Sequence, residues 1–124
     1  MNEVRLEFRN VTKRFRNPNN ANLESITAVE GVSLKVKDGE VVSLIGPSGC
    51  GKSTLLNLAS GLDKPSEGEV FVDAKRVAGP NAHVAFMLQK DLLLPWRSIS
   101  ENVELGLEIQ GVSKTERNER ALNW

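Results

Sequence analysis

The stretch VVSLIGPSGCGKSTLLNLASGL, residues 41–62, decides the fold because three patterns follow one another in it. Residues 41–45 are apolar on both faces apart from one serine, which predicts a strand buried in the middle of a sheet. The next residues, GPSGCGKST, meet the pattern G-x-x-x-x-G-K-[ST]. From Leu55 onward, apolar residues recur at helical spacing, which predicts an amphipathic helix that ends near Gly61. The order strand, glycine loop, helix is the context in which this pattern indicates a phosphate-binding loop.

The loop at residues 46–54 predicts a site for the phosphates of a nucleoside triphosphate, with ATP as the expected ligand. Its glycines let successive backbone N–H groups point inward, and the start of the following helix adds a partial positive charge. Lys52 brings a full charge to the β and γ phosphates, and the hydroxyl of Ser53 is a candidate ligand of Mg²⁺. A chance match has a probability of about one in two hundred in a chain of ordinary composition, so a plain glycine turn with a surface lysine is the weaker alternative.

The residues assigned to the nucleotide site in this loop are Gly46, Pro47, Ser48, Gly49, Cys50, Gly51, Lys52, Ser53 and Thr54. Cys50 lies at the start of the predicted helix, where the pKa of a thiol is lowered. No partner base is identifiable, so we interpret it as a small residue that fills a variable position. As the single cysteine it forms no internal disulfide, which favours a reducing, cytosolic compartment.

The composition excludes several classes of protein. The 124 residues are 40% hydrophobic and 26% charged, as expected of one globular domain or part of one. Sixteen basic and sixteen acidic residues cancel, so nucleic acid is not an expected partner. No apolar run approaches the roughly 18 residues of a membrane span, and the first residues lack the apolar region of a secretory signal.

Strands are predicted on both sides of the loop. Apolar residues alternate from Val4 to Phe8 in a segment that ends near Phe15, and they alternate again in residues 32–36. Residues 17–22, rich in asparagine, predict a surface loop between these two strands. Further strands are predicted at residues 69–72 and 83–88, with a turn at residues 79–81.

Two signals conflict after Pro95. Ser98 and Glu101 form a capping box, which predicts a helix, whereas apolar residues alternate from Val103 to Ile109 as they do in a strand. We interpret this segment as a helix. A second capping box, at Ser113 and three residues on, predicts another helix over residues 114–124.

Two stretches of the chain resemble the ATP-binding subunits of ABC transporters. They are TAVEGVSLKVKDGEVVSLIGPSGCGKSTLLNLASGL, residues 27–62, and VAFMLQKDLLLPWRSISENV, residues 84–103. The run LLPW after the glutamine is typical of the branch that serves importers of nitrate, sulfonate, taurine and related compounds. The resemblance covers nearly all of the chain, whereas a phosphate loop alone also admits GTPases and kinases.

The resemblance implies an α/β fold, in which a P-loop NTPase-type sheet with flanking helices is joined to an amino-terminal antiparallel β part. It implies that residues 1–124 are the amino-terminal half of one ABC-type ATP-binding domain. Residues 1–89 hold the strands and the P-loop, and residues 89–124 hold the Q-loop and the start of the helical part.

The resemblance also assigns two residues outside the loop. Phe15 in VTKRF matches the aromatic that stacks on adenine, a role that suits a flat ring; a core aromatic at a strand end is the alternative. Gln89 matches the Q-loop glutamine, which in the family contacts Mg²⁺ and the attacking water. The resemblance therefore implies that Gln89 is a catalytic residue together with Lys52 and a metal ligand together with Ser53. A surface glutamine is the alternative. His83 does not match the family's switch histidine.

The family's mode of action supplies further expectations. They are ATP hydrolysis with Mg²⁺, a membrane-spanning permease as partner, a homodimer of the complete subunit, and a cytoplasmic place on the inner face of the plasma membrane. Residues 92–94 and Trp96 form an apolar loop that either docks on the permease or packs in a core.

Two family landmarks are missing after Trp96, an LSGGQ-like signature and an apolar strand ending in Asp-Glu. We therefore expect a truncated sequence whose product alone is marginally stable and nearly inactive in hydrolysis. Two alternatives stay open. One is a nucleotide-binding module that never hydrolyses, and the other is a different P-loop enzyme such as a small-molecule kinase or a GTPase, although no N-K-x-D motif reads guanine here.

Overall fold

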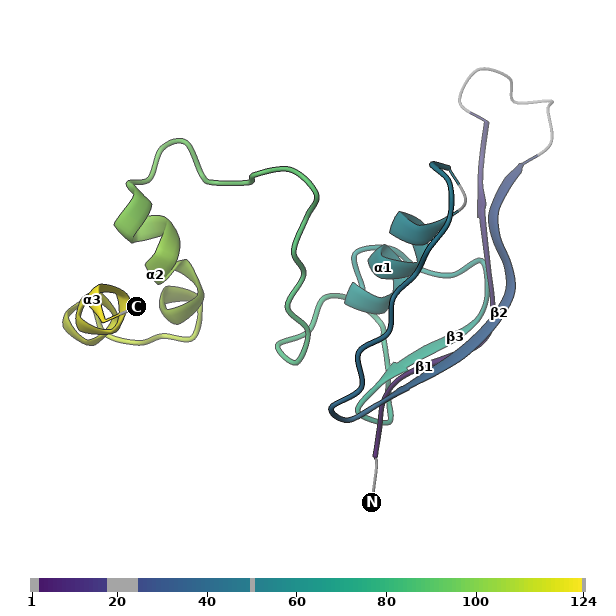
Figure 1. The fold of residues 1–124 in the computed structure, drawn as a ribbon, viewed down its shortest axis with the longest axis horizontal. Helices are drawn as coiled ribbons and strands as arrows, with labels where there is room; N and C mark the ends of the chain where they lie inside the picture. The colour runs from purple at the N-terminus through teal and green to yellow at the C-terminus, as the bar shows by residue number, and fades with distance from the viewer. Residues whose placement is uncertain (1–2, 18–24, 50, 124) are drawn as a thin grey trace. The chain divides into compact units, whose positions relative to one another are not determined.

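The computed structural model describes residues 3–17, 25–49 and 51–123. The chain divides into two compact units, Met1–Phe86 and Met87–Trp124 (Figure 1). In chain order the elements are β1 (Val4–Phe15), β2 (Ile26–Lys37), α1 (Lys52–Ser60), β3 (Glu67–Val72), β4 (Lys75–Arg76), α2 (Ile99–Ile109) and α3 (Lys114–Leu122). The surface loop predicted at residues 17–22 lies almost entirely outside the described residues.

An antiparallel sheet with the order β2-β1-β3-β4 forms the first unit. β1 is central, and its Phe8 is paired with Leu34 of β2 on one side and with Val70 of β3 on the other. The predicted amino-terminal antiparallel part is therefore confirmed. β2 begins earlier in the chain than the alternation in residues 32–36 predicts. The register between β1 and β2 shifts after Phe8, and this shift breaks the two-residue period in the first part of β2.

A small apolar core lies between the sheet and α1. Phe8, Val11 and Val70 of the strands are buried together with Leu58 of α1, and Figure 1 shows α1 against the sheet. Each such side chain contributes about 1.5–3 kcal/mol when it is removed from water. This core fixes the helix that follows the phosphate loop to the sheet.

α1 ends where the sequence predicts. Gly61 has φ 77° and caps the helix, and the N–H of Leu62 donates to the carbonyl of Asn57 at 3.1 Å. A Cβ at Gly61 would lie 2.2 Å from the carbonyl oxygen of Gly79, closer than any side chain tolerates. Only glycine therefore allows this helix end to approach the chain at residue 79.

Two predicted strands do not form. Residues 41–45 and 83–88 have no regular secondary structure, and the side chains of Val41 and Ile45 are 92% and 94% exposed. The apolar pattern predicts burial on both faces, but a strand also needs a hydrogen-bonded neighbour. Within the described residues the sheet includes neither segment, so the prediction of strands at these positions is wrong for this chain.

The second unit is a pair of helices with capped starts. In α2 the Ser98 side chain accepts from the backbone N–H of Glu101 at 3.2 Å, and the Glu101 carboxylate accepts from the Ser98 N–H at 2.7 Å. In α3 the Ser113 hydroxyl accepts from the Glu116 N–H at 3.4 Å. Both predicted helices are confirmed, because the capping residues outweigh the period-two apolar pattern.

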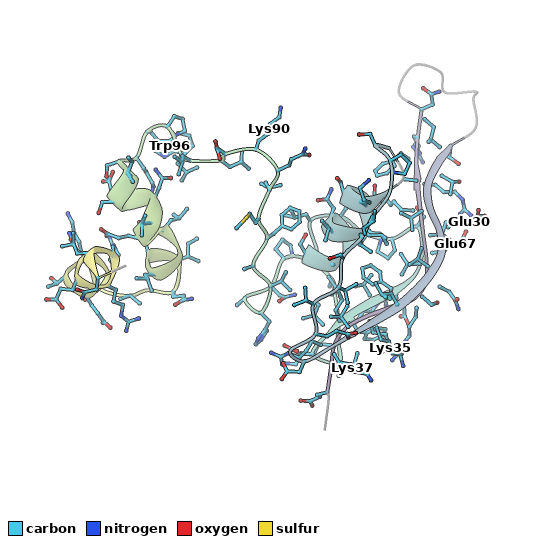
Figure 2. All side chains as sticks on the ribbon, in the orientation of Figure 1. Glu30, Lys35, Lys37, Glu67, Lys90 and Trp96 are labelled. Carbon is cyan, nitrogen blue, oxygen red and sulfur yellow. The ribbon has the colours of Figure 1, made fainter. Side chains whose placement is uncertain are left out.

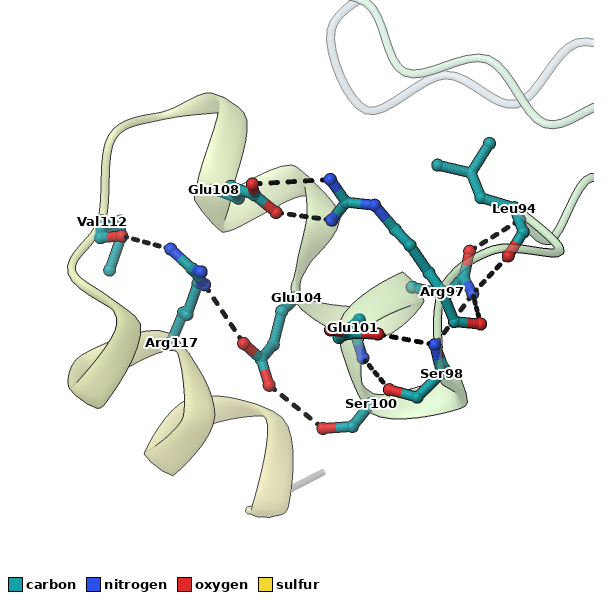
Figure 3. Close-up of polar contacts among 10 residues, drawn as sticks. Leu94, Arg97, Ser98, Ser100, Glu101, Glu104, Glu108, Val112 and Arg117 are labelled. Atoms are coloured by element: carbon teal, nitrogen blue, oxygen red, sulfur yellow. Dashed lines mark hydrogen bonds and ion pairs between the residues drawn. The ribbon is translucent and has the colours of Figure 1, made fainter.

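An ion pair between Arg117 of α3 and Glu104 of α2 connects the two helices of this unit (Figure 3). The buried carboxylate of Glu104 accepts from Arg117 Nε at 3.1 Å and from the Ser100 hydroxyl at 3.0 Å. Arg97 pairs with Glu108, and this hydrogen bond holds the pKa of the Glu108 carboxyl below its usual value. A buried carboxylate is stable only with such partners.

In the described part of the chain, no helix has the length and hydropathy of a membrane span.

Candidate nucleotide-binding site

The predicted phosphate loop leads into the amino-terminal end of α1. Its described residues are 46–49 and 51–54, and Cys50 lies outside the described residues. α1 begins at Lys52, with no acidic residue in its first turn and no side-chain hydrogen bond at its amino-terminal cap. The first N–H groups of a helix lack partners within it and carry partial positive charge. This helix end is therefore suited to bind an anion.

Lys52 folds back over the loop. Its ammonium donates hydrogen bonds to the carbonyl oxygens of Gly46 and Pro47, the second at 2.8 Å. The full positive charge of Lys52 is thus held at the start of the loop, in addition to the partial positive charge at the start of the helix. Ser53 and Thr54 follow in the first turn, with Ser53 exposed. The residues present fit a triphosphate with its Mg²⁺, because Mg²⁺ takes few protein ligands and shares the phosphate oxygens.

The end of the loop lies directly against β2. Gly51 has φ 94°, and a Cβ built on it would lie 2.5 Å from the carbonyl oxygen of Ala28 and 2.9 Å from Cγ2 of Val29. Val29 is paired with Lys13 of β1 in the sheet. The loop therefore contacts the part of the β1–β2 pair that leads to Phe15.

Phe15 is at the last position of β1, paired with Ile26. Its ring is 41% exposed, whereas the core residue Phe8 is 3% exposed. An exposed aromatic at this end of the sheet offers a ring face to a flat ligand. The structure thus places Phe15 on the same strand pair that the phosphate loop contacts.

Sequence reasoning missed Lys13. Its ammonium lies 5.0 Å from the centre of the Phe15 ring and donates to Asp63 Oδ1 at 2.7 Å and to the Lys64 carbonyl at 2.8 Å. These partners lie 50 residues or more along the chain, so no local pattern points to them.

This ion pair predicts a dependence of stability on pH. The hydrogen bond from Lys13 holds the pKa of the Asp63 carboxyl below its ordinary value of 3.8. Because the pKa is lower in the folded state, the stabilisation is complete above pH 3.8 and is lost as the pH falls through the folded pKa. We expect Asp63→Asn to lower the free energy of unfolding by about 1 kcal/mol at neutral pH, and this difference to shrink in acid.

Urea unfolding of both proteins from neutral to acidic pH measures this difference. Asp91→Asn, at an exposed aspartate, is the matched control and is expected to change little. A difference between wild type and Asp63→Asn that stays constant through the acidic range would contradict the role of the ion pair.

Gln89 lies in the second unit, at an exposed bend. Gln89 and the phosphate loop belong to different units, so the contact of Gln89 with a bound nucleotide stays a prediction.

Leu92, Leu93 and Trp96 are exposed rather than packed in a core; Figure 2 labels Trp96 and Lys90. His83 is exposed, with Nδ1 3.8 Å from a carboxylate oxygen of Asp73, as expected of a surface residue. Among the described residues, no three His, Cys, Asp or Glu side chains cluster as metal ligands.

Comparison with known proteins gives one family profile and several ATP-binding proteins of import systems. The ABC transporter family profile matches residues 29–124. The taurine import ATP-binding protein TauB of Burkholderia pseudomallei is 48% identical over 97 residues, which are 78% of this chain and 37% of TauB. The Fe(3+) ions import ATP-binding protein FbpC of Escherichia coli O157:H7 is 41% identical over 118 residues, which are 93% of this chain and 32% of FbpC.

A solved structure is similar along most of the chain. The dimeric post-hydrolysis state of the ATP-binding cassette MJ0796, bound to ADP and Pi, matches with a TM-score of 0.81 and 38% identity. The match covers 95% of this chain and 54% of that chain, so the chain spans about half or less of the proteins that it resembles. It has the mixed α/β fold of ABC ATPase cassettes. The chain belongs to the ABC transporter family, among its ATP-binding domains.

Proposed function

We propose that the chain binds the triphosphate of MgATP in the loop at residues 46–54. The observation that carries this proposal is the Lys52 ammonium, which is held over the loop carbonyls beside the amino-terminal end of α1. A full charge and a row of backbone N–H groups then meet the phosphates from two sides. In the whole protein, ATP binding and hydrolysis energise solute import through a membrane-spanning permease.

Each residue of the proposed site has a chemical role. Lys52 binds the β and γ phosphates and stabilises the negative charge that develops when the bond to the γ-phosphate breaks. Ser53 would hold Mg²⁺ through its hydroxyl, and in the whole protein Gln89 would orient the attacking water and contribute to the metal site. When bound, Mg²⁺ neutralises phosphate charge. The backbone N–H groups of Gly49, Gly51 and Thr54, with those of the other loop residues apart from Pro47, fix the position of the phosphates.

Phe15 is proposed to stack on adenine, and this supplies the test of the proposal. We expect Phe15→Ala to raise the Kd for MgATP about fivefold to hundredfold, because an aromatic face contributes about 1–3 kcal/mol to base stacking. The affinity for inorganic tripolyphosphate, which has no base, is expected to stay the same. Calorimetric titration of the whole chain with both ligands measures the two effects separately.

Phe71→Ala is the matched control, since this half-buried phenylalanine of β3 lies under Arg9 instead of beside the loop. It is expected to leave the ratio of the two affinities unchanged. GTP in place of ATP tests the rival GTPase function. Equal affinity for ATP and GTP, together with an unaltered ATP Kd in Phe15→Ala, would refute base recognition by this ring.

The rest of the mechanism is proposed for the whole protein. We propose a homodimer, a cytoplasmic place on the inner face of the plasma membrane, and docking of the exposed Leu92, Leu93 and Trp96 against the permease. The run LLPW and the similarity to TauB support a sulfonate, taurine or nitrate importer.

We propose that this chain alone binds ATP and hydrolyses it very slowly. Phosphate release, measured together with ATP binding, separates a hydrolysing chain from a non-hydrolysing one.

A further inference from the structure

We propose that Lys13 is a positioning residue that orients the Phe15 ring for the nucleotide base and couples the base contact to the phosphate-loop helix. The inference rests on the proposed stacking of adenine on Phe15. It goes beyond that stacking because it assigns a role to a lysine that touches neither the base nor the phosphates.

Two hydrogen bonds hold the Lys13 ammonium in place independently of the Phe15 ring. The side chain is 13% exposed, and its ammonium donates to Asp63 Oδ1 at 2.7 Å and to the Lys64 carbonyl at 2.8 Å. An ammonium has three donors, and two of them are directed to the segment that follows α1. The charge therefore has a defined position, 5.0 Å from the centre of the Phe15 ring.

A cation at one face of the Phe15 ring has two effects on the other face. It restricts the tilt of the ring, because departure from the ammonium loses the cation–π attraction. It also draws π-electron density toward itself, so the opposite face repels an electron-rich purine less. The exposure of the ring leaves surface for such a ligand.

The same lysine connects the ring to the carboxyl end of α1. The N–H of Asp63 donates to the carbonyl of Asn57 at 3.3 Å, within the last turns of the helix. The amino-terminal end of the same helix carries the phosphate-binding groups of the loop. Asp63 and Lys13 thus form a chain of hydrogen bonds and a cation–π contact that links the end of α1 to the ring.

The backbone beside the ring is held by other contacts. The N–H of Arg14 donates to Ser66 Oγ at 2.9 Å, and the Arg14 side chain pairs with Glu67. Phe15 itself is paired with Ile26 in the sheet. Removal of the Lys13 charge is therefore expected to affect the ring more than the course of β1.

Lys13→Met tests the proposal, because methionine keeps an unbranched apolar stem and removes the charge. We expect the Kd for MgATP to rise about threefold to tenfold, while the Kd for Mg-tripolyphosphate changes less than about twofold. Lys13→Arg restores the charge and is expected to recover most of the ATP affinity. Calorimetric titration of the wild type and both variants with the two ligands gives the dissociation constants, and circular dichroism melts report folding.

Two results would overturn the proposal. If ATP and tripolyphosphate affinities fall together, Lys13 has a purely structural role; if neither falls while Phe15→Ala still weakens ATP, the ring needs no positioning. If Phe15→Ala has no effect, the stacking itself is refuted, which is a distinct outcome. Asp63→Asn keeps the test decisive where Lys13→Met does not fold, since it loosens the ammonium without removing it and is expected to weaken ATP selectively.

Discussion

Lys52→Ala is expected to weaken the binding of both MgATP and tripolyphosphate by at least about a hundredfold, because charge-assisted hydrogen bonds to phosphate are among the strongest in proteins. The ammonium is already held over the loop, where it donates to the carbonyls of Gly46 and Pro47. Little reorganisation is needed to transfer these hydrogen bonds to phosphate oxygens. Calorimetric titration with both ligands measures the loss, and circular dichroism verifies that the variant folds.

Lys75→Ala is the matched control for this prediction. Lys75 is an exposed lysine in β4, and its removal is expected to alter either Kd by less than about twofold, as for most surface substitutions. Equal losses in the two variants would mean that overall charge governs binding. Unchanged binding in Lys52→Ala would refute the phosphate site itself.

Gly51→Ala is expected to lower both stability and nucleotide affinity. The backbone at Gly51 has φ 94°, a conformation that costs other residues about 1–3 kcal/mol. The added Cβ would also lie 2.5 Å from the backbone oxygen of Ala28, which cannot yield as a flexible side chain does. We expect a loss of about 2–4 kcal/mol in the free energy of unfolding, measured by urea denaturation, and a weaker phosphate site because the loop moves away from β2.

Gly39→Ala separates the two causes. Gly39 also has positive φ, 72°, but a Cβ added there would meet no atom of the described residues within 4 Å. This control is expected to show the backbone strain alone, about 1 kcal/mol, with intact nucleotide binding. Equal destabilisation at both positions would contradict a close contact between the loop and β2.

The local parts of this fold are predictable from the sequence. The alternation around Phe8 predicts β1, Gly61 marks the end of α1, and Ser98 with Glu101 marks the start of α2. Each signal depends on neighbours within a few residues, so it does not require knowledge of the rest of the chain.

Features that depend on distant partners are not predictable in this way. The strand expected at residues 41–45 is absent because an apolar pattern does not supply a hydrogen-bonding neighbour. The bond between Lys13 and Asp63 joins residues 50 positions apart. In the candidate site, the loop follows from its motif and Phe15 from the family resemblance, whereas the exposure of Phe15 and the contact of Gly51 with β2 are seen only in three dimensions.

The two units differ in the kind of force that holds them together. Phe8, Val11, Leu58 and Val70 give the first unit a hydrocarbon interior, whose stabilisation weakens on cooling. In α2 the buried residue is the acidic Glu104, held by Arg117, and α3 has no buried residue among those described. The helix pair therefore depends on a buried pair of charges, which dissolved salt screens much less than an exposed pair. Cooling consequently weakens the interior of the first unit, whereas the buried contact of the second unit fails when either charged partner is removed.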